Sequence, residues 1–398
     1  MLKHNFDELV NRKKTECKKW DTYAEDVIPM WIADTDFKCP QPVIDAMVKR
    51  AEHGIYGYPV NCKTFEQSII NWQKKRFDWD VDIDWVEYTP AVVPAIVYAM
   101  RAFTNPGDNI VIQMPAYHPF HDIIPNNGRH ILGNNLILKE DGSYEVDYEN
   151  LEALLSKKRT TMFLLCSPHN PVGKCFTREE LTRISELCLK HNVFVVSDEI
   201  HSDIIYRGSK HIPFGSLSQE AADNCVVCVN PSKTFNIAGV RTGAVIIPNR
   251  HNHDLFYAPL ENNKAYGRTV FGTLPIEVSY NECDYYADQL LEYLQGNLEY
   301  LENFVSTRIP KIKVSKMQAT YLIWLNCKEL NMGPKELHSF FLEEVKVAMN
   351  FLEEVKVAMN EGSTFGPGGA GFMRMNIACP RSRLVEALER MEAAINKR

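Results

Sequence analysis

Five short apolar runs, separated by turns and helical patterns, lie between residues 104 and 249 of this 398-residue chain. The runs cover 109–114, 160–166, 193–197, 224–229 and 243–247. After the second run, residues 177–191 read as a helix with a capping box, because Thr177 and Glu180 stand three residues apart. Continuous apolar strands that alternate with helices are typical of a mostly parallel sheet covered on both faces. We therefore expect an α/β fold.

Four of these runs are followed directly by side chains that can do chemistry. Tyr117 comes after the first run, Asn170 after the second, Asp198 after the third and Lys233 after the fourth. Each residue taken alone fits ordinary turn, cap or packing chemistry. In open α/β sheets, however, ligands bind beyond the carboxyl ends of the strands. The four placements together predict a site that combines an aromatic ring, an amide, a carboxylate and an amine.

The lysine lies in the most informative stretch, residues 227–243. Most lysines are solvated surface charges. A lysine amine can nevertheless bind a carbonyl cofactor covalently when burial and nearby positive charge keep it neutral near pH 7. Ser232 and Arg241, in the same stretch, are residue types that bind phosphate. The stretch therefore indicates a cofactor with both a carbonyl and a phosphate group.

Residues 232–243, Ser-Lys-Thr-Phe-Asn-Ile-Ala-Gly-Val-Arg-Thr-Gly, resemble the lysine segment of pyridoxal 5'-phosphate (PLP) enzymes of the aspartate aminotransferase superfamily, fold type I. The resemblance is strongest to the cystathionine β-lyase, or cysteine-S-conjugate β-lyase, branch. It spans nearly the whole chain, with several separate motifs in the family's order. It implies a large PLP-binding domain over 46–275 and a small α+β domain formed by 1–45 and 276–398.

The resemblance implies a role for each residue of the predicted site. Lys233 would be the catalytic lysine and Asp198 would face the pyridine nitrogen. Asn170 would donate to the ring oxygen and Tyr117 would stack on the ring. The cofactor phosphate would be bound by Ser232, Arg241 and the helix start at Val92 and Val93.

Three further residues are assigned by resemblance to the substrate and to a second subunit. Arg374 lies inside the apolar run Phe-Met-Arg-Met-Asn-Ile, where a charge requires a partner. It matches the arginine that binds the substrate α-carboxylate, and Ala33 would offer backbone to the same group. Tyr58 matches a tyrosine that reaches the cofactor phosphate of the other subunit. A homodimer with shared active sites is therefore expected.

His201 distinguishes two reactions. Many aminotransferases of the superfamily have a tyrosine here that bonds to the cofactor ring oxygen, whereas Asp-Glu-Ile-His-Ser-Asp resembles the β-lyase branch. A histidine after a strand is also commonly structural. We predict a carbon–sulfur β-lyase that converts L-cystathionine, L-cysteine or cysteine S-conjugates to pyruvate, ammonia and a thiol.

Two alternatives remain. A class I/II aminotransferase, using an amino acid and a 2-oxo acid, would share every residue named except for the preference implied by His201. A non-catalytic protein that retains the PLP fold is the other, and the presence of Lys233, Asp198 and Arg374 argues against it.

Composition limits the possible partners and the location. The net charge is −7 and no Lys/Arg-rich run stands out, so neither nucleic acid nor an anionic membrane is expected as a partner. No apolar stretch approaches the roughly 18 residues of a membrane span, and the N-terminus lacks the apolar core of a signal peptide. Eleven cysteines fit reduced thiols. We expect a cytoplasmic protein.

Two motifs are not given a ligand. Cys225-Val-Val-Cys228 lies inside an apolar run without a second pair, so no metal site is predicted. The glycine-rich residues 362–371 precede a strand rather than a helix and lack a Walker lysine, which argues against a nucleotide loop.

The C-terminal third contains a perfect repeat. Residues 341–350 recur letter for letter at 351–360. A ten-residue shift turns a helical face by about 280°, so the two copies cannot share one helical role. We interpret the repeat as a tandem duplication or a sequence error, with one copy ending a helix and the other entering the strand before Glu361. Around it we expect helices over 274–305, 334–347 and 381–396, and a polar connection over 250–275.

Overall fold

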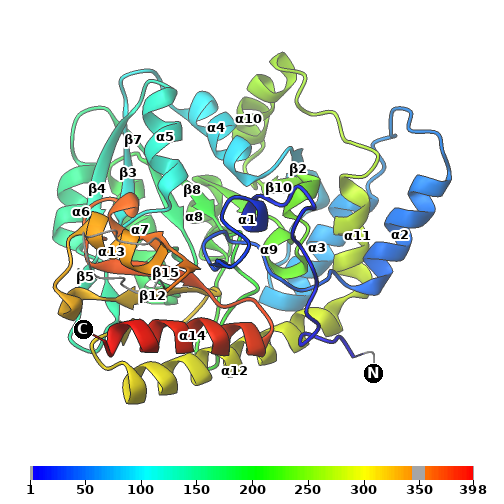
Figure 1. Ribbon diagram of the computed structural model, residues 1–398. Helices are drawn as coiled ribbons and strands as arrows, with labels where there is room; N and C mark the ends of the chain where they lie inside the picture. Colours follow the sequence, from blue (N-terminus) through cyan, green and yellow to red (C-terminus); the bar gives the residue numbers. More distant parts are fainter. Residues whose placement is uncertain (1–2, 343–354, 398) are drawn as a thin grey trace.

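The structure is a computed structural model that describes residues 3–342 and 355–397 (Figure 1). Within these residues, the larger sheet has seven strands in the order β2-β10-β9-β8-β7-β3-β4. They are Val86–Thr89, Gly243–Ile246, Cys225–Val229, Phe194–Asp198, Thr160–Cys166, Asn109–Met114 and His130–Asn135. β10 is antiparallel to both of its neighbours, and the pairs from β9 to β4 are parallel. The predicted mostly parallel sheet is confirmed.

Both faces of this sheet are buried, as the continuous apolar runs predicted. Successive strand residues point to opposite faces, so Ile110 and Ile112 of β3 belong to one apolar core and Val111 to the other. The first core includes helices α4 (Val92–Phe103), α5 (His118–Asn126) and α10 (Arg250–Asn262); the second includes α6 (Tyr148–Leu155), α7 (Arg178–Lys190) and α8 (Gln219–Asp223). With both faces covered, the ends of the strands are left as the place where a ligand can bind.

A second sheet is antiparallel, with strands in the order β11-β12-β15-β14. They are Lys313–Val314, Leu322–Asn326, Phe372–Asn376 and Asn360–Glu361. The two helices α12 (Asp284–Arg308) and α14 (Arg381–Ile395) contact each other and run side by side below it in Figure 1. The N-terminal strand β1 (Ile28–Pro29) pairs with β13 (Val357–Ala358). The domain boundaries at 46 and 275 stay a prediction.

The remaining elements are short or lie at the periphery. They are α1 (Lys18–Asp21), α2 (Gln41–Glu52), α3 (Thr64–Phe77), α9 (Ser232–Phe235), α11 (Thr273–Glu282), α13 (Pro334–Leu342), β5 (Ile137–Leu138) and β6 (Tyr144–Glu145), with short 3₁₀ turns at 83–85, 214–216, 238–240, 328–330 and 362–365.

Two expectations about helices are wrong. Residues 250–262 are not part of a polar connection but form α10, because Asn249 caps its first turn and Phe256 and Leu260, four residues apart, are buried. The helix expected over 274–305 is two helices, since the backbone leaves the helical region at Cys283, with φ −118° and ψ 27°. α11 packs against α2 and α3, whereas α12 packs against α14.

The repeated decapeptide is only partly described. Its second copy enters β13 and then β14, which confirms the predicted strand before Glu361. The prediction for the first copy, beyond Leu342, lies outside the described residues.

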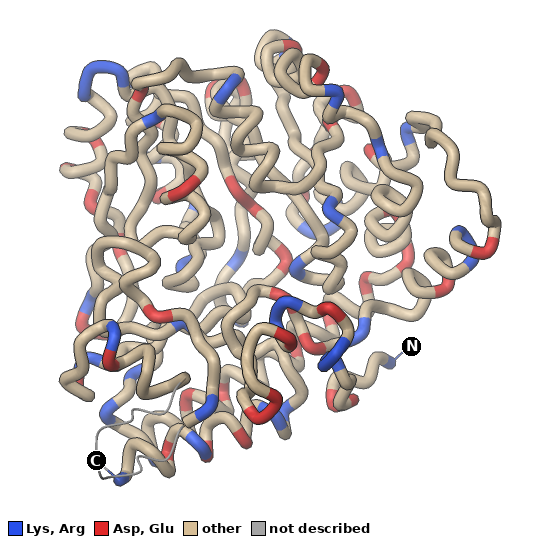
Figure 2. The backbone as a smooth tube through the Cα atoms, turned by 45° about the horizontal axis from the view of Figure 1, so that its top comes forward, with Lys and Arg blue, Asp and Glu red and all other residues tan. Residues whose placement is uncertain are grey.

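Charged residues of both signs are interspersed along the backbone (Figure 2). Among the described residues, none of the helices combines the length and the apolar character needed to cross a bilayer.

The capping box of α7 provides a test of the fold. The Thr177 side chain accepts a hydrogen bond from the Glu180 backbone N–H, and the Glu180 carboxylate accepts one from the Thr177 N–H. Thr177→Ala should lower the free energy of unfolding by about 1 kcal/mol, because a backbone donor loses its acceptor. Thr307→Ala, in an exposed last turn of α12, is the control and should change it by less than about 0.5 kcal/mol. Equal denaturation midpoints for the two variants would contradict the role of the cap.

Candidate active site

A cavity of about 350 Å³ lies where the strands of the larger sheet end. Its size suits a small organic ligand. The predicted residues that line it are Ala33, Val92, Val93, Tyr117, Asn170, Asp198, His201, Ser232, Lys233 and Arg241. The structure therefore brings together all the predicted site residues except Tyr58 and Arg374, and Arg374 is hydrogen-bonded to the lining residue Asn170.

Lys233 lies in α9, the single helical turn that follows β9. Its Nζ donates to the carbonyl oxygen of Ala33 at 2.7 Å. The pKa of Lys233 is lowered to about 8, chiefly by burial; Asp34 opposes this change, Arg374 adds to it and Asp198 opposes it. A substantial fraction of the amine is therefore neutral near pH 7 to 8, which a lysine that attacks a carbonyl requires.

Asp198 ends β8 and is 3% exposed. Its Oδ1 accepts from the Ile200 N–H at 3.2 Å. Burial raises the pKa of Asp198 to about 6, although the backbone hydrogen bond and the charge of Lys233 lower it. A buried carboxylate with so little stabilisation would be favoured by a cation placed against it. A protonated pyridine nitrogen fits that requirement.

Another part of the cavity lining suits a phosphate. The N-terminus of α4 opens onto it at Val92 and Val93, after Ala91, whose φ of 128° is unusual for a residue with a side chain. Backbone N–H groups at a helix start favour an anion. Within the described part of the chain, Arg241 is exposed and has no ion-pair partner. A phosphate would supply the negative charge that this arrangement lacks.

Ser232 is positioned by the residues around it. Its backbone N–H donates to Asn230 Oδ1 at 2.8 Å, and Asn230 Nδ2 donates to the Thr242 carbonyl at 2.6 Å. These bonds tie the turn after β9 to the start of β10, and both Ser232 and Arg241 line the cavity.

Arg374 is a buried cation without a carboxylate partner among the described residues. It donates to Asn170 Oδ1 at 3.0 Å, to the Trp31 carbonyl at 2.9 Å and to Asn360 Oδ1 at 2.7 Å. Its Nε is buried and has no hydrogen-bond partner. Burial lowers the pKa of Arg374 to about 10. A substrate carboxylate would provide the missing counter-charge through a charge-assisted bond.

His201 lies against the cavity as a neutral ring. It is 3% exposed and its ring meets Tyr321 edge-on, with 6.1 Å between centroids. Burial, and then the charges of Lys233 and Arg374, lower the pKa of His201 to about 3. Its Nδ1 is buried without a partner. A neutral imidazole can donate to a ring oxygen, and this role for His201 stays a prediction.

Tyr58 is fully exposed, in a segment that also exposes Ile55, Tyr56 and Val60. It does not line the cavity of its own chain. This placement is compatible with the expected contact to a second subunit, which stays a prediction.

Some cavity residues were not predicted from the sequence. They include Pro94, Cys166, Ile200, Asn230, Ala238 and Thr242. Asn230 directly follows β9, so the strand-end rule used for the other residues could have found it. Tyr321, whose hydroxyl donates to the Ala33 carbonyl at 3.2 Å, precedes a strand of the second sheet and gives no local signal.

The mostly parallel sheet, which delivers a lysine, a carboxylate and an amide to one cavity, belongs to the fold-type I, PLP-dependent transferase architecture that was predicted. The sequence matches the pattern of aminotransferase class I and II over residues 25–391, and the chain belongs to this family.

Curated relatives and solved structures match along their full length. Cystathionine beta-lyase PatB of Bacillus subtilis is 42% identical over 397 residues, covering 98% of this chain and 100% of that protein. Protein MalY of Escherichia coli is 31% identical, with 98% of each chain covered. The structure of cystalysin from Treponema denticola, which contains a pyridoxal 5'-phosphate cofactor, matches with a TM-score of 0.94 at 33% identity, covering 100% of both chains.

Asp198 yields a prediction about stability in the cofactor-free protein. Its folded pKa of about 6 lies above the ordinary value of about 3.9. Ionisation therefore opposes folding, from little effect below pH 4 to about 3 kcal/mol above pH 6. Asp198→Asn should therefore stabilise the protein relative to wild type by more at pH 8 than at pH 5. The free energy of unfolding is measured by denaturant titration without cofactor. The same change at both pH values would contradict the cause assigned to the pKa.

Proposed function

We propose that this chain is a PLP-dependent carbon–sulfur β-lyase acting on L-cystathionine, L-cysteine or related cysteine S-conjugates. The observation that supports it most is the cavity lined by Lys233, Asp198 and Asn170, with Asn170 bonded to Arg374, a cation that has no carboxylate partner among the described residues. The 42% identity to a cystathionine beta-lyase over the whole chain points to the same reaction. With L-cystathionine, water would enter and pyruvate, ammonia and L-homocysteine would leave.

PLP, when bound, withdraws electrons from the substrate Cα through its ring. Asp198 would keep a proton on the pyridine nitrogen, and Asn170 and His201 would face the ring oxygen. Tyr117 would stack on the ring, while Ser232, Arg241 and the N-terminus of α4 would hold the phosphate.

The remaining residues would act on the substrate. Arg374 would bind the α-carboxylate and so orient the Cα–H bond, with Ala33 at the same group. Lys233, whose amine has a pKa of about 8, would accept the α-proton. When the β-carbon carries a thiolate leaving group, loss of that thiolate completes the elimination.

An aminotransferase is the second candidate, because the family comprises aminotransferases. In addition, one solved structure matches with a TM-score of 0.94 at 38% identity, and it is described as a PLP-bound putative aminotransferase from Clostridium difficile 630. Transamination would need the same binding groups, but the proton removed from Cα would be delivered to the cofactor and a 2-oxo acid would be required to complete the cycle.

We also propose a homodimer in which Tyr58 reaches the phosphate of the partner's cofactor. The exposed apolar side chains Ile55, Tyr56 and Val60 support an interface at this segment. All eleven cysteines are free, which supports a reducing, cytoplasmic location.

The reaction is tested with purified holoenzyme and L-cystathionine in the absence of any 2-oxo acid. We expect sustained release of pyruvate with the cofactor spectrum retained. One turnover that leaves pyridoxamine phosphate, with activity restored by 2-oxoglutarate, would instead establish an aminotransferase.

Lys233→Ala should reduce kcat by about 10²–10⁴-fold or more, because the proton acceptor is lost. It should also abolish the covalent attachment of cofactor that borohydride makes permanent, as detected by mass spectrometry. Lys311→Ala, at an exposed position, is the control and should retain both properties. Borohydride-stable attachment that survives Lys233→Ala would contradict the assignment of the lysine.

The dimer is tested by charging its proposed interface. Ile55→Asp with Val60→Asp should yield a monomer in analytical ultracentrifugation and weaken cofactor binding, because buried carboxylates would oppose association. Ile137→Asp, at another exposed apolar position, should leave the oligomeric state unchanged. A wild-type protein that sediments as a monomer would refute the homodimer.

A further inference from the structure

The segment 33–36 lies directly against the catalytic lysine. The Ala33 carbonyl accepts hydrogen bonds from Lys233 Nζ at 2.7 Å and from the Tyr321 hydroxyl at 3.2 Å. The position of this one carbonyl therefore decides where the lysine amine is held. None of the predicted site residues explains what holds the carbonyl itself.

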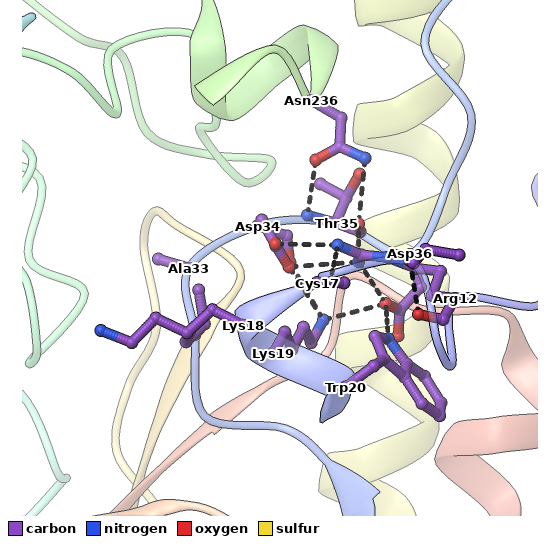
Figure 3. Close-up of polar contacts among 12 residues, drawn as sticks. Arg12, Cys17, Lys18, Lys19, Trp20, Ala33, Asp34, Thr35, Asp36 and Asn236 are labelled. Carbon is purple, nitrogen blue, oxygen red and sulfur yellow. Dashed lines mark hydrogen bonds and ion pairs between the residues drawn. The ribbon is translucent and has the colours of Figure 1, made fainter. Parts of the chain in front are cut away.

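Two carboxylates of this segment, Asp34 and Asp36, are paired with two cations from outside it, Arg12 and Lys19. These four residues are here called the N-terminal charge cluster (Figure 3). Arg12 contacts both carboxylate oxygens of Asp34, at 3.2 and 3.0 Å. It also donates to Asp36 Oδ1 at 2.7 Å and to the Thr35 carbonyl at 2.8 Å. One guanidinium thus binds both carboxylates and the backbone between them.

Lys19 completes the cluster from α1. It is 1% exposed, and its Nζ donates to the Asp34 carbonyl at 3.1 Å and to Asp36 Oδ1 at 3.2 Å. Trp20 Nε1 donates to the same oxygen at 2.9 Å, and Arg383 lies 3.7 Å from the other oxygen of Asp36. Burial opposes ionisation, but Lys19, Trp20 and Arg12 lower the pKa of Asp36. These partners therefore favour the ionised form of Asp36, although its Oδ2 is buried without a hydrogen-bond partner.

Two asparagines connect the segment to the elements that carry the active-site cations. Asn236, the residue after α9, accepts from the Thr35 N–H at 3.2 Å and donates to the Thr35 carbonyl at 3.0 Å. Asn376 of β15 donates to the Asp34 carbonyl at 2.7 Å. The segment is thus fixed between the turn that carries Lys233 and the strand that carries Arg374.

The cluster also bears on the charge at the lysine. The charged groups that face Lys233 are Asp34, Asp198 and Arg374, with the neutral His201 and Tyr321 beside them. Asp34 is the larger of the two charges that raise the pKa of Lys233. Arg12 and Lys19 lie within 3.4 Å of Asp34, and cations so placed oppose the field of this carboxylate at the amine.

We propose that Arg12 and Lys19 are positioning residues for Lys233: they fix the segment 33–36 so that the Ala33 carbonyl meets the amine, and they neutralise the Asp34 carboxylate beside it. The inference rests on the proposed function, in which Lys233 bonds to the cofactor and accepts the substrate proton. It adds that the pH at which the Lys233 amine becomes reactive is set by residues that do not touch substrate or cofactor.

The test uses opposite changes of charge. Arg12→Gln leaves Asp34 less neutralised, so the pH at which the lysine becomes reactive should rise by about 0.5–1 unit; Asp34→Asn should lower it by a similar amount. In the double variant the two shifts should largely cancel. Arg12→Lys, which keeps the charge, should restore the midpoint of wild type.

The first readout is the pH dependence of kcat for the holoenzyme, which reports the ionisation of Lys233 while substrate is bound. The second uses the full-length protein after removal of cofactor: the rate at which pyridoxal phosphate is captured at Lys233, trapped with borohydride and counted by mass spectrometry. Only a neutral amine attacks a carbonyl, so this rate reports the protonation of the lysine. Lys14→Gln, which removes an exposed cation paired with Glu25, is the matched control and should shift neither midpoint.

A merely structural role would lower activity or thermal stability in these variants without moving the midpoints in opposite directions, and that result would overturn the inference. If Arg12→Gln does not fold, Asp34→Asn decides, and an unchanged midpoint refutes the proposal. Failure of wild type to capture PLP at Lys233 or to release pyruvate would instead refute the proposed function.

Discussion

The burial of Arg374 without a carboxylate partner among the described residues is the constraint on which this site depends. Arg374 is enclosed by amide and carbonyl oxygens rather than by a carboxylate, and Lys233 is held by a single carbonyl. Such cations are costly to bury. The surrounding elements must therefore hold them in place until ligands bring the missing negative charge. The strands, turns and asparagines around the cavity can be understood as the means of doing so.

Much of the fold was predictable because its signals are local. Each apolar run of the larger sheet is buried on both faces, and that alone produces continuous rather than alternating hydrophobicity. The carboxyl ends of neighbouring parallel strands meet at one edge, so Asn170, Asp198 and Lys233 could be placed together from their positions after the runs. The helix at 178–190 was equally predictable, since its capping box consists of four consecutive residues.

What could not be predicted depends on contacts between distant parts of the chain. α10 has a polar composition and an internal proline, and its burial of Phe256 and Leu260 becomes apparent only once α4 and the sheet are in place. The N-terminal charge cluster is similar: Arg12 and Lys19 read as ordinary surface cations, and nothing near them in sequence indicates a carboxylate pair to bury them. Tyr321 reaches Ala33 across 288 positions of sequence.

The position of the N-terminal segment has a consequence for the order of assembly. Its strand β1 pairs with β13, and Asn376 and Asn236 bind the backbone of residues 32–37. Residues 28–37 are synthesised several hundred residues before their partners at 357–376, and closing so long a loop is slow. The larger sheet can form beforehand, but Lys233 would still lack the carbonyl that orients it. The chain should therefore be able to bind the cofactor productively only late in synthesis, after β15 has left the ribosome.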